Sequence, residues 1–167
     1  LATLLVLATL AGAGLYWLSG NINRLAKNAI ESYGSAMTLG NVKVGSVKIA
    51  AANGQGTISN LVIGNPPGFK TTHAMKLGRL AIDIDISSIT NDVIHIRRIA
   101  IVAPEVIYEK GDVLTNFDAI QVNIGTYLGP DDNDPNTPME KKGGKRLIVD
   151  ELTVREAKAE ASAAFMN

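Results

Sequence analysis

One spacing of apolar residues recurs along the chain and constrains its fold more than any other feature. Side chains stand at steps of two, three and two residues in several separate runs. These runs are Val42, Val44, Val47 and Ile49; Met75, Leu77, Leu80 and Ile82; Ile94, Ile96, Ile99 and Ile101; and Leu147, Val149, Leu152 and Val154, with a partial copy at Ile58, Leu61 and Ile63. A step of two places side chains on one face of a strand, and most of these residues are β-branched or Leu. The pattern therefore predicts strands rather than helices.

The single step of three needs a separate explanation, because it would turn the rest of a regular strand onto the wrong face. One extra, bulged residue in each strand restores the alternation. We therefore predict bulges near Gly45–Ser46, Gly78–Arg79, Arg97–Arg98 and Asp150–Glu151, at about the same height. Aligned bulges curve a sheet. The predicted fold is α+β: a curved, bulged antiparallel sheet that is apolar on one face, with one or two short packing helices.

The first 18 residues contain no charged side chain and end in an aromatic pair, Tyr16 and Trp17. As a helix, this run would span about 27 Å at about 1.5 Å per residue, close to the roughly 30 Å of a bilayer's hydrocarbon core. We interpret residues 1–18 as a transmembrane helix. The alternative is a signal peptide, because Ala11-Gly12-Ala13 has the small residues of a cleavage site.

Residues 19–38 predict an amphipathic helix with Asn21 as its N-cap. Its apolar positions are Ile22, Leu25, Ala26, Ala29, Ile30 and Tyr33. We expect this helix to pack on the sheet; the alternative is a helix lying on the bilayer surface. Residues 39–167 then form one β-rich domain, in which Asn116 caps a second short helix and residues 129–145, rich in Pro, Gly, Asp and Lys, form a flexible loop.

Several classes of function lack support in the sequence. Net charge is +0, which removes the usual electrostatic argument for binding nucleic acid, and the absence of cysteine removes thiolate metal sites. Paired carboxylates at Asp83 and Asp85 suit a solvated strand face better than acid–base catalysis. The acidic run of Asp131, Asp132 and Asp134 lacks the glycine and closing glutamate of a calcium-binding EF-hand. With His73 and His95 isolated in the sequence, we expect no enzyme activity, no cofactor and no metal.

A family resemblance rests on longer stretches. The N-terminal apolar helix, the amphipathic helix and the run Gly40-Asn41-Val42-Lys43-Val44-Gly45-Ser46-Val47 resemble the start of AsmA-like proteins of Gram-negative bacteria. The similarity continues through Gly56-Thr57-Ile58-Ser59-Asn60-Leu61-Val62-Ile63-Gly64-Asn65-Pro66-Pro67-Gly68-Phe69, the strand at 80–89 and Pro104-Glu105-Val106-Ile107-Tyr108-Glu109. The resemblance implies a single-pass inner-membrane protein with its β domain in the periplasm. It also implies envelope lipid handling, although this chain has only the first strands of the long groove found in larger members.

The candidate site is the apolar face of the predicted sheet. We expect one continuous patch, on the membrane-distal side of the bulges, that holds lipid or packs against another surface: Val47, Ile49, Leu61, Ile63, Leu80, Ile82, Ile99 and Ile101. Two functions follow. In the first, the face holds acyl chains from the bilayer. In the second, the chain is an accessory subunit that docks on a larger membrane protein complex. The two differ in whether the helices cover the face.

Overall fold

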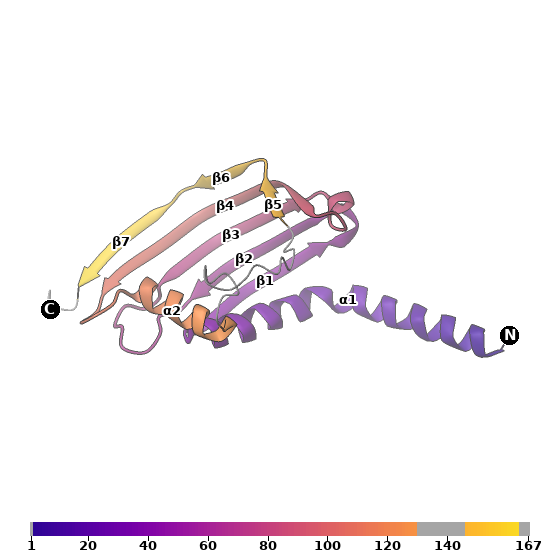
Figure 1. Ribbon diagram of the computed structural model, residues 1–167, viewed down its shortest axis with the longest axis horizontal. Helices are drawn as coiled ribbons and strands as arrows, with labels where there is room; N and C mark the ends of the chain where they lie inside the picture. Colours follow the sequence, from indigo (N-terminus) through magenta and orange to yellow (C-terminus); the bar gives the residue numbers. More distant parts are fainter. Residues whose placement is uncertain (1, 130–145, 164–167) are drawn as a thin grey trace, which may run out of the picture.

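The computed structural model describes the backbone of residues 2–129 and 146–163, and the side chains of residues 20–129 and 146–162. The chain is an α+β protein in which a curved, open sheet of seven strands is accompanied by two α-helices (Figure 1). The elements are α1 (Ala2–Thr38), β1 (Val42–Ala50), a 3₁₀ turn (Ala51–Asn53), β2 (Gln55–Ile63), β3 (Met75–Ile84), a 3₁₀ turn (Ile86–Ser88), β4 (Val93–Lys110), α2 (Asn116–Leu128), β5 (Arg146–Val149), β6 (Leu152–Arg155) and β7 (Lys158–Ala163).

The sheet is mixed, so the antiparallel prediction is only partly right. Strands β1 to β4 pair in sequence order as antiparallel neighbours. Strands β5, β6 and β7 instead follow one another along the outer side of β4 and run parallel to it. They are parallel because the chain returns to the start of β4 before β5 begins, where Arg146 pairs with Val93. Strand β4 has 18 residues and passes through Pro104 without ending there.

A kink crosses the sheet at one residue in each strand, and we call these residues the kink row: Gly45, Asn60, Gly78, Ala103 and Glu156. Asn60, Ala103 and Glu156 have φ angles of 53°, 49° and 56°, in the left-handed region. Strands β1 and β3 carry glycine in this row, and a Cβ on Gly45 would lie 3.0 Å from the carbonyl oxygen of Ser59. Within β1 to β4, each pairing therefore sets a left-handed residue beside a glycine, whereas in the pairing beyond β4 Ala103 and Glu156, both left-handed, stand opposite each other.

The kink row replaces two of the predicted bulges. Pairing keeps the same register on both sides of Gly45 and Gly78, so no extra residue is present there and the bulge predictions at these two places are wrong. The register shifts between Asp83 and Ile84, opposite Arg97, which confirms the bulge predicted at Arg97–Arg98. The prediction at Asp150–Glu151 falls on the interruption between β5 and β6. The irregularities therefore lie at two heights, not one.

Helix α1 is continuous from Ala2 to Thr38, so the N-cap predicted at Asn21 is wrong. Its C-terminal half lies along the edge strand β1, antiparallel to it, and its N-terminal half projects beyond the sheet (Figure 1). Within the described residues, no helix is both long and apolar enough to cross a membrane. The side chains of the predicted transmembrane segment, residues 1–18, lie outside that description.

One stripe of α1 occupies the open edge of β1. Backbone N–H groups of Val42, Val44 and Ile49 donate to Ser35 Oγ, Glu31 Oε1 and Asn23 Oδ1, at 2.9, 2.9 and 2.8 Å. The acceptors stand at steps of four and eight residues, so they share one helix face. Helix α1 therefore covers the edge of the sheet in addition to packing on it. Two of its predicted apolar positions, Leu25 and Tyr33, are exposed. Capping an edge in this way prevents pairing with another chain there.

Candidate functional site

Cross-strand pairing aligns the apolar residues into rows on one face of the sheet, the apolar face. One row runs Val47–Ile58–Leu80–Ile101–Val154, and the next runs Ile49–Gly56–Ile82–Ile99–Leu152. Beyond the kink row, Val44 pairs with Leu61 and Leu61 with Leu77. Val44 and Val47 are exposed by only 3% and 8%, so the face is kept across the step of three. The apolar residues of β1 on the two sides of the kink row therefore lie on the same face.

The predicted patch falls on both sides of the kink row. Six of its members, Val47, Ile49, Leu80, Ile82, Ile99 and Ile101, lie in the two rows on the side where α1 begins its contact with β1. Leu61 and Ile63 lie on the other side, near the end of α1. The six lie toward the projecting half of α1 (Figure 1). Their predicted membrane-distal position stays a prediction.

Helices cover only one end of the apolar face. Helix α2 crosses it near the end of β4, where Phe117 stacks on Tyr108 with ring centroids 6.4 Å apart, and Asn123 Nδ2 donates to the carbonyl oxygen of Thr38 at the end of α1. We call this end the covered part: Val42, Val44, Leu61, Ile63, Met75, Leu77 and Val106. Its Val42, Val44 and Leu77 are buried.

The remaining rows form the open part of the face: Val47, Ile49, Ile58, Leu80, Ile82, Ile84, Ile94, Ile96, Ile99, Ile101, Leu147, Val149, Leu152 and Val154. Apart from Val47, beside α1, its residues on β1 to β4 are half-buried. On the outermost strands, Leu147 and Leu152 are each 63% exposed. Among the described side chains only six hydrophobic ones are buried, so this sheet does not enclose a full core.

The covered end is fastened from the opposite side by a buried polar network that sequence reasoning missed. Glu109, at the end of β4, accepts hydrogen bonds from Lys70 N, Thr71 N and Thr71 Oγ1 at 2.7, 2.8 and 2.6 Å. Asn116 donates to Asn65 Oδ1 and Ile107 O and accepts from Glu109 N. Asn65, the first residue of the turn at 65–69, is therefore held in place by this network. The cap of α2 is Thr115, not Asn116, with Asp118 completing a capping box.

The face opposite the apolar one carries most of the ordered charge pairs. Arg97, the bulged residue, donates from Nε to Asp83 Oδ1 at 3.0 Å, and this hydrogen bond holds the pKa of Asp83 below its usual value. Arg98 donates from Nε to Glu151 Oε2 at 2.9 Å and lowers the pKa of Glu151 in the same way. Asp85 does not join Asp83: it caps the 3₁₀ turn by accepting from Ser87 N, and the hydrogen bonds from Ser87 lower its pKa.

No arrangement among the described residues supplies an evident catalytic centre. His73 is buried between Thr72 Oγ1 and Glu105 Oε1, at 2.7 and 2.9 Å, where it ties the loop before β3 to β4. His95 is exposed on β4 and makes no contact with His73. No group of three or more His, Cys, Asp or Glu side chains in the described segments has the geometry of a metal site. The acidic run at Asp131, Asp132 and Asp134 lies outside those segments.

Comparisons with known proteins add no relative. The chain matches no family model, no curated protein and no solved structure. The resemblance to AsmA-like proteins therefore rests on the sequence stretches quoted above.

Proposed function

We propose that this protein is a membrane-anchored, non-enzymatic lipid-handling domain whose open apolar face holds acyl chains. The observation that carries the proposal is the continuity of apolar rows across the strands, covered by helices at one end only. Rows of Ile, Leu and Val offer hydrocarbon contact without polar competition, and exposed apolar surface of this extent marks an interaction site.

The position of α1 supports the same proposal. Its N-terminal half projects from the sheet end at which the apolar face is open (Figure 1). If the uncharged run at residues 1–18 lies in a bilayer, the open part would face that bilayer and the covered part would point away. An acyl chain would then enter along the apolar rows and stop at α2. Placement in the inner membrane, with the β domain in the periplasm, follows from the AsmA-like resemblance.

One substitution tests the proposal with a matched control. Ile82→Asp places a charge in the open part, whereas Lys43→Asp places an aspartate at an exposed position of β1 on the opposite face. The purified full chain should retain phospholipid in wild type and in Lys43→Asp but lose it in Ile82→Asp, as measured by extraction and mass spectrometry. Melting temperatures of both variants should stay within a few degrees of wild type, because Ile82 is only half-buried.

Val44→Asp shows the effect expected from a charge at a position of the apolar face that the helices cover. Val44 is 3% exposed in the covered part, and burying an unpaired carboxylate there costs several kcal/mol, so this variant should unfold. A wild-type protein free of lipid, combined with unfolding of Ile82→Asp, would refute the lipid-handling proposal.

A second function, an accessory subunit docking on a larger complex, is favoured by one observation. The outer edge of β5 and β6 is not covered by any described element, and its Leu147, Ile148 and Leu152 are exposed by 63%, 45% and 63%. Uncovered strand edges pair readily with other chains. Co-purification of a stoichiometric membrane complex, without lipid, would support this function instead.

A further inference from the structure

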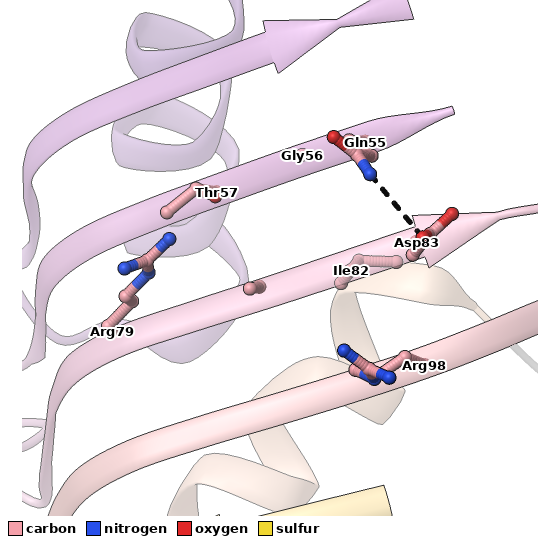
Figure 2. Close-up of a pocket in the computed structure, with 8 residues that line it drawn as sticks. Gln55, Gly56, Thr57, Arg79, Ile82, Asp83 and Arg98 are labelled. Carbon is pink, nitrogen blue, oxygen red and sulfur yellow. Dashed lines mark hydrogen bonds between the residues drawn. The ribbon is translucent and has the colours of Figure 1, made fainter. Parts of the chain in front are cut away.

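A shallow depression of about 200 Å³ lies on the face opposite the apolar one and plays no part in lipid handling as proposed (Figure 2). Its floor includes Ala81 on β3, which pairs with Ala100 on β4. Small side chains at the centre of a strand face leave room above the backbone. A second depression, of about 230 Å³, adjoins the first through Arg98 and has Ala100 in its lining.

Strand register places two arginines at opposite corners of the alanine pair. Arg79 stands two residues before Ala81 on β3, and Arg98 stands two residues before Ala100 on β4. Because the strands are antiparallel, the two arginines lie on either side of the alanines. Thr57, the β2 partner of Ala81, lies beside Arg79, and Gln55 donates to Asp83 at the far rim (Figure 2).

The charge around this depression is unbalanced. Its nearest carboxylates are already engaged, Asp83 by Arg97 and Glu151 by Arg98. Arg79 is exposed and has neither hydrogen bond nor ion pair within the described part of the chain. The chain as a whole is neutral, so this excess of donors and positive charge is local.

We propose that the depression binds a phosphate group, with Arg79 as its main ligand and Thr57 beside it. A guanidinium presents a planar fork of donors that matches two phosphate oxygens, and the Thr57 hydroxyl supplies a neutral donor beside it. The alanine floor lets a tetrahedral anion approach the sheet. Asp83 at one rim disfavours an anion there and confines the phosphate to the Arg79 side. This proposal does not depend on lipid in the apolar face.

Titration of the full chain with inorganic phosphate, followed by NMR, tests the site. Wild type should show saturable shifts at Arg79, Thr57 and Ala81. Arg79→Gln should weaken binding about tenfold, the effect of losing one charge-assisted interaction, and Arg79→Lys should recover part of it. Lys43→Gln removes an exposed charge from β1 beyond the kink row and should leave binding unchanged. The fold should survive, because Arg79 is exposed.

Vesicles distinguish the two sources of such a phosphate. A preference for phosphatidylglycerol over phosphatidylcholine vesicles that is lost in Arg79→Gln would assign a lipid headgroup. Saturation by inorganic phosphate, without a preference between the two vesicles, would assign a free phosphate compound. The proposal fails if inorganic phosphate does not saturate the site and neither vesicle is preferred, or if Lys43→Gln weakens binding as much as Arg79→Gln, since screening of overall charge would then explain the effect.

Discussion

Glu109 is the residue on which the covered end of the sheet most depends. Burial alone would raise the pKa of its carboxyl, but hydrogen bonds from Thr71 and from the backbone of Lys70 and Thr71 outweigh burial and lower it. A lowered folded-state pKa stabilises the protein above the ordinary glutamate value of about 4.3, and this contribution is lost as pH falls through the folded pKa. The attachment of the loop before β3 to β4 should therefore weaken at low pH, where this carboxylate is protonated.

Glu109→Gln should destabilise the protein at pH 7 by about 1–3 kcal/mol, because an amide cannot accept all three hydrogen bonds. The difference from wild type should shrink as pH falls below the ordinary glutamate value of about 4.3, because the carboxylate's contribution is lost progressively down to its lowered folded pKa. Urea unfolding at pH 7 and at pH 3.5 measures both. Glu151→Gln, at an exposed pair, serves as the control and should have little effect. An unchanged difference at pH 3.5 would contradict this role.

Ala103 has a strained backbone conformation, and its methyl side chain makes no hydrogen bond that could offset the strain. Its φ of 49° lies in the left-handed region, which costs an L-residue roughly 1–2 kcal/mol relative to glycine's freedom. Ala103→Gly should therefore raise stability by up to about 1 kcal/mol. Ala100→Gly, in ordinary extended backbone three residues earlier on β4, should lower it. Urea unfolding midpoints of the two variants measure both changes. An equal loss of stability in both variants would show that the backbone at Ala103 is not strained.

At the scale of the elements, the sequence pattern predicted the features that depend on neighbouring residues in the chain. Strands β1 to β4 and the apolar face follow from Val and Ile spacing, and α2 follows from its apolar positions. The kink row escaped prediction because Ala103 and Glu156 have no compositional preference for positive φ; only Asn60 does. Strand β7 escaped because Ala159 and Ala161 are weak strand formers that pair with β4 only once the chain has returned to it.

The contacts at the edge of the sheet could not be predicted from the sequence, because they join segments that are distant in the chain. The polar positions Asn23, Glu31 and Ser35 suit a solvated helix face, and only the packed structure reveals that they accept hydrogen bonds from β1. The alanine-floored depression likewise combines residues of three strands, Thr57, Ala81 and Arg98, that no sequence spacing connects. In the sequence, the only sign of this depression is that small and basic residues alternate with the apolar residues of the strands.

At the scale of the whole molecule, the two halves of α1 stand in different relations to the sheet. Described contacts between α1 and β1 begin at Asn23, which accepts from Ile49 N, and continue to Ser35. The part of α1 before residue 20 projects past the sheet (Figure 1). Among the described side chains, the edge cap and the packing of the β domain on α1 come from the C-terminal half of the helix.

Deletion of residues 1–19 should therefore leave the β domain folded, with a melting temperature within a few degrees of the full chain. The same deletion should abolish co-sedimentation with phosphatidylcholine vesicles if residues 1–18 form the anchor. Deletion of residues 1–36 provides the contrast, because it also removes the acceptors for Val42, Val44 and Ile49 and exposes the edge of β1. That longer deletion should lower stability and promote aggregation through the bare edge. Unfolding after the shorter deletion, or membrane binding that survives it, would show that the N-terminal half of α1 supports the fold rather than anchoring it.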